Sequence, residues 1–156
     1  MSTVPDSSSG VLTRMRAASG VLTRGVPQRW PTPGRVIGAA LVLLGAAMVG
    51  ASAVIHLHLW SLGYRHIHLI GPAFLAQGIG GLILAVTLAA YRRLAVIAVG
   101  AAYLAGSIGA LLLSASVGFL GLHDGLDVPW AAGSLTTELI GLVSLISVGA
   151  AILRAN

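Results

Sequence analysis

The residues of this chain that could do chemistry are its histidines and a few acids, which occur in small groups separated along the sequence. The histidines are His56, His58, His66, His68 and His123. Asp124 and Asp127 follow the last of them, and imidazole together with carboxylate is a ligand set that binds zinc or copper. The combination such a metal site would use is His56, His66, His123 and Asp124.

Helical geometry restricts that site. If residues 56–58 are helical, side chains two positions apart point about 200° away from each other, so at most one of His56 and His58 can face a common ion. A transmembrane haem needs two histidines facing each other across a bundle, and no histidine lies in the middle of an apolar run. We therefore expect no cofactor, with zinc, copper or haem at the outer face as the alternative.

Glu138 is the sharpest single candidate. The uncharged run after it, residues 139–153, is shorter than the roughly 20 residues that cross a bilayer. The helix should therefore begin near Ser134 as N-cap, which puts Glu138 about one turn inside the membrane boundary. An acid there needs a partner, and we expect an ion pair with Arg65, or with His123 as the second option. The acid is then either structural, in this ion pair or as a capping acid at the helix N-terminus, or part of a proton- or cation-coupled site in a small transporter or channel.

The elements that must position these residues are four long apolar runs. Of the 156 residues, 56% are hydrophobic and 8% are charged, whereas soluble domains carry about 25% charged residues. Runs of this length and polarity are typical of membrane-spanning helices. The sequence predicts an all-α membrane protein, a four-transmembrane-helix bundle, with spans at about 36–59, 70–91, 94–121 and 134–153.

The charges predict how the bundle lies in the membrane. We expect a disordered basic cytoplasmic tail over residues 1–35 and a transmembrane domain over residues 36–156. Arginines precede the first run, separate the second from the third and follow the fourth, while Arg65 is the exception. By the positive-inside rule, both termini are then cytoplasmic, in a multi-pass protein of the plasma membrane. This topology accounts for the basic net charge of +5 without a nucleic-acid partner.

The polar residues inside the runs do not form a catalytic set. Gln77 is expected to hydrogen-bond to a neighbouring helix, and serines such as Ser107 and Ser144 to bond to their own backbone. The chain has no cysteine, and no nucleophile–base pair or phosphate loop is visible. We predict a non-enzyme with a structural or accessory role, whose partners are the lipid bilayer and a membrane-protein complex or a second copy of the chain.

Small residues recur at four-residue spacing, which lets helix backbones approach closely in lipid. Packing within the bundle is the favoured interpretation, and a specific dimer or partner face is the alternative. The pairs and rows are Ala46 and Gly50; Ala76 and Gly80; Ala102, Gly106 and Ala110; and Ala101, Ala105 and Gly109.

One stretch of the chain resembles known proteins. Its motifs are His-Leu-His-Leu-Trp at 56–60, Gly-Tyr-Arg at 63–65, Ile-Gly-Pro at 70–72 and Phe-Leu-Ala-Gln at 74–77. This stretch resembles small actinobacterial four-helix integral membrane proteins of unassigned function. Those relatives carry a proline where His68 stands, which argues against a ligand role for His68. The resemblance implies that Tyr64 and Arg65 form a shared outer-loop feature, and it supplies no substrate.

Overall fold

The computed structural model describes residues 15, 18–28, 31–118 and 130–155. Its four long helices are α2 (Thr32–Ser61), α3 (Ile70–Tyr91), α4 (Leu94–Val117) and α5 (Ala131–Arg154). All four are long and apolar enough to cross a membrane. A short 3-10 helix, η1 (Tyr64–His66), lies between α2 and α3, and no strand is named within the described ranges. The predicted all-helical, four-span architecture is confirmed.

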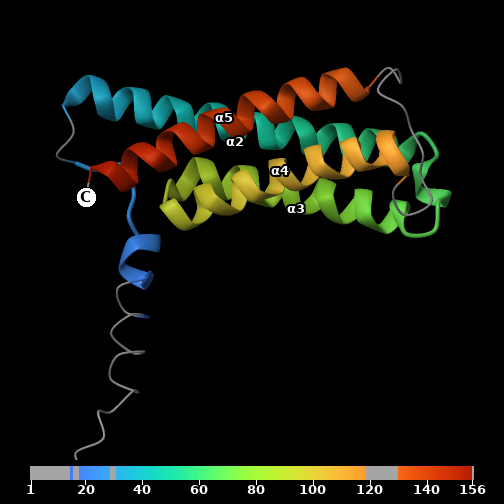
Figure 1. Ribbon diagram of the computed structural model, residues 1–156, viewed down its shortest axis with the longest axis horizontal. Helices are drawn as coiled ribbons and strands as arrows, with labels where there is room; N and C mark the ends of the chain where they lie inside the picture. Colours follow the sequence, from blue (N-terminus) through green and yellow to red (C-terminus); the bar gives the residue numbers. More distant parts are fainter. Residues whose placement is uncertain (1–14, 16–17, 29–30, 119–129, 156) are drawn as a thin grey trace, which may run out of the picture.

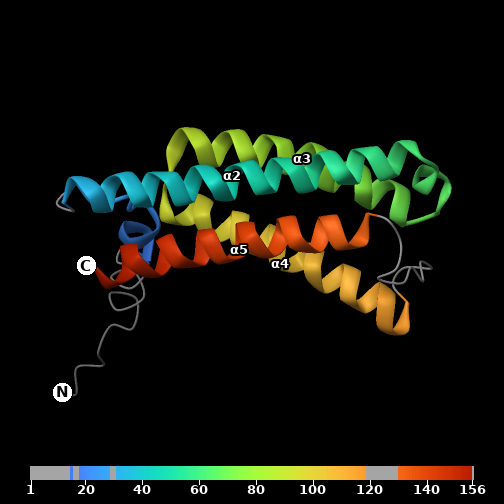
Figure 2. The same cartoon turned by 90° about the horizontal axis from the view of Figure 1, so that it is seen from above.

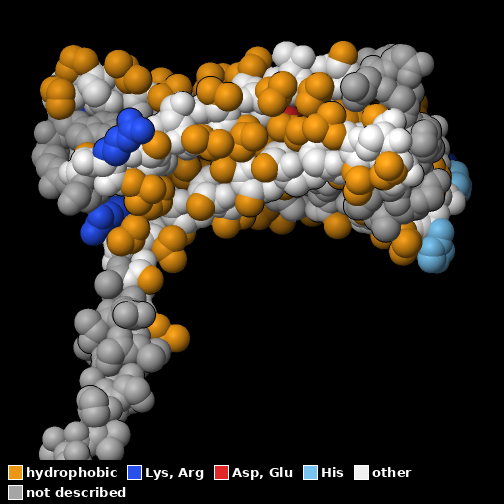
Figure 3. All heavy atoms as spheres, in the orientation of Figure 1, with side chains coloured by type: hydrophobic (Ala, Val, Ile, Leu, Met, Phe, Trp, Pro, Cys, Tyr) orange, Lys and Arg blue, Asp and Glu red, His pale blue; other side chains and the backbone are white. Residues whose placement is uncertain are grey.

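The helices alternate in direction and form a four-cornered bundle. Figures 1 and 2 together show α2 beside α3 and α5, with α4 at the opposite corner and crossing the bundle obliquely. The start of α2 and the end of α5 lie at the same end of the bundle. Arginine side chains are seen at that end in Figure 3, histidine side chains at the other, and hydrophobic side chains cover the surface between. We call these the arginine end and the histidine end.

Two features at the arginine end are the start of α2 and the tight turn between α3 and α4. α2 begins at Thr32, earlier than the predicted residue 36, because Pro33 suits a first turn in which its missing N–H has no partner to lose. Only Arg92 lies between the last residue of α3 and Arg93, the N-cap residue of α4, and Arg92 adopts the left-handed conformation (φ 45°). The Leu94 N–H donates to the Arg24 carbonyl at 2.7 Å, so part of the predicted tail contacts the bundle.

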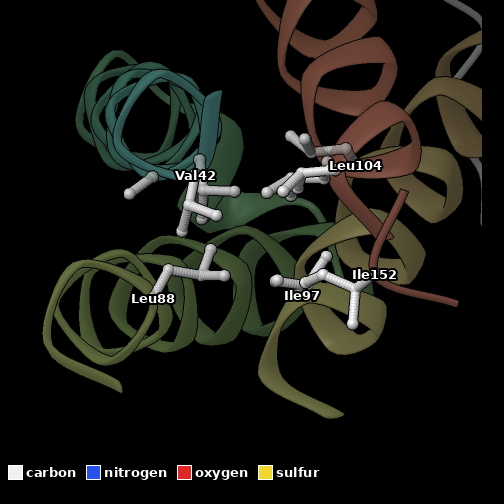
Figure 4. Close-up of a cluster of buried hydrophobic side chains, with 9 residues drawn as sticks. Val42, Leu88, Ile97, Leu104 and Ile152 are labelled. Carbon is white, nitrogen blue, oxygen red and sulfur yellow. The ribbon is translucent and has the colours of Figure 1, made fainter. Parts of the chain in front are cut away.

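The apolar core runs between the helices on the arginine side of the bundle's middle. Figure 4 shows side chains from all four helices converging there. Burying these groups against one another supplies the close van der Waals contacts that hold helices together in lipid, where a hydrophobic driving force between helices is missing. The core residues are Val42, Ala46, Val49, Leu88, Ile97, Leu104, Leu145, Val148 and Ile152.

Glycines bring the helix backbones close at particular contacts. A Cβ at Gly45 of α2 would lie within 2.6 Å of two atoms of Leu145, which is fully buried. On α3, Gly78 faces Leu57, and Gly81 faces Tyr103 and Ala53. These positions set how near α2 comes to α3 and α5, and therefore which polar groups deeper in the bundle can meet.

We expect Gly45→Ala to destabilise the bundle. The added methyl would overlap Leu145, which is fully buried, and overpacking of this kind costs about 1–3 kcal/mol. Thermal unfolding of purified protein in mild detergent measures the effect. Gly50→Ala is the control on the same helix, because its Cβ would lie 3.6 Å from Ala85, an ordinary contact. Equal unfolding temperatures for the two variants would contradict the packing.

Candidate functional site

The carboxyl group of Glu138 is enclosed by serine hydroxyls from three helices. Its Oε1 accepts hydrogen bonds from Ser107 Oγ at 2.6 Å, Ser52 Oγ at 2.8 Å and Ser134 Oγ at 3.0 Å. Glu138 has no exposed surface, and the three serines are each at most 8% exposed. We call these four residues the Glu138 cluster. It is a compact, all-oxygen site carrying one carboxyl group.

Each member of the Glu138 cluster is positioned by regular helix geometry. Ser134 precedes Glu138 by four residues on α5, so the two side chains lie on one face of that helix. Ser52 belongs to α2 and Ser107 to α4, and both side chains point into the bundle. Because these helices cross near the carboxyl group, three chain segments supply donors to one oxygen atom.

The Glu138 cluster lies deeper than predicted. α5 begins at Ala131, with Trp130 as its N-cap position, so the prediction of Ser134 as N-cap is wrong. Glu138 lies seven positions after Ala131, which corresponds to about 10 Å along the helix axis at about 1.5 Å per residue. Ser107 lies near the middle of α4, about 20 Å along the axis from Leu94. The carboxyl group is therefore inside the apolar part of the bundle rather than at its rim.

The two carboxyl oxygens have unequal environments. Oε1 accepts three hydrogen bonds, whereas Oε2 is buried and has no partner among the described residues. An acid at the centre of a membrane helix costs about 2.5–3.5 kcal/mol, and a hydrogen bond to a charged group contributes about 1.5–3 kcal/mol. The three hydroxyls are thus enough to hold the acid in place, but they leave one acceptor oxygen unsatisfied.

The predicted ion pair with Arg65 is not formed. Arg65 is exposed in η1 at the histidine end, where its Nε donates to His66 Nε2 at 3.1 Å. Glu138 is fully buried among serines, so the two side chains do not meet. The pairing fails because α2 and α4 supply hydroxyl donors at the depth of the carboxyl group, and Arg65 lies beyond the end of α2. His123, the second expected partner, lies outside the described residues.

Tyr64 belongs to a small aromatic group at the histidine end. Its ring stacks on Phe74 of α3 with centroids 5.3 Å apart, and His56 meets the same ring edge-on at 5.1 Å. Gly71 lies against the backbone of Arg65, where a Cβ would fall 2.5 Å from the carbonyl oxygen. Tyr64 and Arg65 therefore both belong to the packed segment that connects α2 to α3, although their side chains contact different residues.

The histidines of α2 separate as the helical geometry predicts. His56 is 7% exposed, and its Nδ1 donates to the Ser52 carbonyl at 2.8 Å, because a carbonyl can only accept. His58 is exposed and meets the ring of Trp130 edge-on. Within the described ranges, no group of three His, Asp or Glu side chains is placed to hold a metal ion. Of the proposed ligands, His123 and Asp124 lie outside those ranges.

Tyr103 connects the Glu138 cluster to the fourth helix. Its hydroxyl donates to the main-chain carbonyl of Gln77 on α3 at 3.1 Å. The same hydroxyl lies near Ser52 and within electrostatic reach of Glu138. Gln77 accepts this bond through its backbone carbonyl, so the predicted hydrogen bond from its side chain to a neighbouring helix stays a prediction.

The sequence did not predict the serine partners of Glu138. Ser144 does bond to its own helix, at the Ile140 carbonyl, as predicted, but Ser107 bonds to Glu138 instead. The only local signal was Ser134, four residues before the acid. Nothing in the sequence relates Ser52 or Ser107 to Glu138, because those contacts depend on how the helices pack.

Ser107→Ala should lower the free energy of unfolding by about 1.5–3 kcal/mol, because it removes the shortest hydrogen bond to a buried carboxyl group. Chemical or thermal unfolding in detergent measures the change. Ser116→Ala is the control on the same helix, since Ser116 is exposed and donates only to the Leu113 carbonyl, and it should stay within about 0.5 kcal/mol of the parent. A Ser107→Ala protein as stable as the control would show that the hydrogen bond contributes little.

Comparison with protein-family models, curated proteins and solved structures gives no match for this chain. The resemblance to small actinobacterial four-helix proteins stays a prediction.

Proposed function

We propose that this small multi-pass membrane protein has an accessory role, in which it binds another transmembrane helix rather than catalysing a reaction. The binding surface is an outward-facing strip of α4, which we call the α4 small-residue face. It consists of Ala102, Ala105, Gly106 and Gly109, all of them exposed.

One observation carries this proposal: the glycines of this face are not used inside the bundle. A Cβ added at Gly106 or at Gly109 would have no atom within 4 Å. By contrast, a Cβ at Gly45 or Gly78 would overlap a leucine of a neighbouring helix. The chain therefore contains glycines that serve its own packing and others that its own packing leaves open.

Helix geometry makes the open glycines a continuous surface. The four positions follow the i, i+3, i+4, i+7 pattern, so they lie on one side of α4. With no large side chains there, a second helix can approach backbone to backbone and gain van der Waals contacts that lipid chains would otherwise supply less well. Of the sequence-predicted rows, Ala46 and Gly50 pack inside the bundle, whereas Gly80 of α3 is open like the α4 face.

The charges support a definite orientation for this role. The start of α2, the end of α5 and the Arg92–Arg93 turn all lie at the arginine end, and basic residues favour the cytoplasmic side. We propose a plasma-membrane location with both termini cytoplasmic. The α4 small-residue face then lies at the level of the hydrocarbon, where a transmembrane helix rather than a soluble protein would cover it.

Site-specific photo-cross-linking tests the proposal. The chain has no cysteine, so a single Ala105→Cys variant can be labelled with a benzophenone maleimide in native membranes. We expect a discrete protein adduct, and its mass distinguishes a second copy of the 15.8 kDa chain from a different protein. Adding Gly106→Leu should reduce the adduct about tenfold, which corresponds to about 1.4 kcal/mol.

The control is Ala47→Cys, because Ala47 is an equally small and exposed residue on α2, outside the α4 face. It should give no discrete protein adduct. Lipid adducts alone from Ala105→Cys, or the same protein adduct from both positions, would overturn the proposed partner surface.

A further inference from the structure

We propose that the Glu138 cluster is a binding site for a single sodium ion. The starting observation is that Glu138 Oε2 is buried and unpartnered, although three hydroxyl groups lie around the other carboxyl oxygen. Buried polar atoms are normally satisfied, so an unpartnered carboxylate oxygen inside a membrane bundle points to a ligand that binds oxygen.

Charge balance selects a monovalent cation. Glu138 forms no ion pair with an arginine or a histidine of the described chain, and its nearest polar groups are neutral hydroxyls. A carboxylate taken into a low-dielectric interior is costly without a compensating charge. One monovalent ion neutralises the site, whereas a divalent ion would leave a net positive charge in the same apolar surroundings.

The ligand atoms select a hard ion of small size. The site offers two carboxylate oxygens and three hydroxyl oxygens, with no sulfur, and such oxygens suit hard cations rather than soft transition metals. The three hydroxyl oxygens lie 2.6, 2.8 and 3.0 Å from Oε1, so the oxygens are already gathered closely. A close set of oxygens fits sodium better than the larger potassium ion. The hydroxyl groups can rotate to turn their lone pairs toward the ion.

Binding at this position would join the whole bundle. Ser52, Ser107 and the pair Ser134–Glu138 come from α2, α4 and α5, and Tyr103 continues the contact to α3 through the Gln77 carbonyl. An ion that binds only the assembled cluster stabilises the folded state by mass action. The site is separate from the α4 small-residue face, because Ser107 points about 200° away from Ala105 and from Gly109.

The experiment measures sodium binding to the purified full chain in detergent. Sodium chloride replaces choline chloride at constant ionic strength and pH, while radioactive sodium binding and the unfolding temperature are recorded. We expect one saturable site per chain, an unfolding temperature that rises with sodium concentration, and binding of potassium at least about tenfold weaker.

Variants assign the binding to the cluster. Glu138→Gln keeps the shape of the side chain but removes the charge, and it should abolish sodium binding. Ser134→Ala should weaken sodium binding by about tenfold or more. Ser144→Ala is the matched control, because Ser144 is a buried serine of the same helix that donates to its own backbone, and it should bind sodium like the parent.

Three results would overturn the assignment. The first is an identical response to sodium and choline, as expected if a water molecule satisfies Oε2. The second is stabilisation that follows pH and not sodium, which would make the ligand a proton. The third is equal sodium binding by Ser134→Ala and Ser144→Ala, and this comparison decides the matter even if Glu138→Gln fails to fold.

Discussion

The carboxyl group of Glu138 has to find its partners among neighbouring helices, because hydrocarbon offers no hydrogen-bond donors. It obtains three of them on a single oxygen, from Ser52, Ser107 and Ser134. Each hydrogen bond requires a helix to lie at one depth and one rotation. The relative placement of α2, α4 and α5 therefore depends on one side chain. The Glu138 cluster joins these three helices by directional hydrogen bonds, whereas the apolar core contributes only non-directional contacts.

Close helix packing makes this cluster possible. Serine side chains are short, so their hydroxyls reach a common oxygen only if the backbones are near. Gly45, Gly78 and Gly81 remove the side chains that would hold α2 away from α5 and α3. Tyr103 fills the space beside Gly81 and carries the polar contact on to α3. The glycines thus set the distances between the helix backbones, and at these distances the serine hydroxyls reach Glu138 and hydrogen-bond to it.

Helix α4 has one side that packs inside the bundle and another side that faces outward. One side of this helix presents Leu104 and Ser107 to the interior, while the other presents alanines and glycines outward. A helix surrounded only by lipid gains nothing from glycine, since larger apolar side chains would fill the surface and favour the helix. The open glycines of α4 form the surface that we propose for contact with another protein helix, and this surface is separate from the Glu138 cluster inside the bundle.

The sequence by itself determined the number of spans, their approximate limits and the opposition of basic and histidine-bearing ends, because hydrophobic length and charge are local properties. It also determined that His56 and His58 would face different ways, since helix rotation is fixed by spacing. Only the tertiary structure decided that Glu138 pairs with serines and not with Arg65, and that Gly50 packs inward while Gly106 lies open. Those outcomes depend on the rotation and crossing of whole helices, which arise from side-chain packing between segments up to 86 residues apart.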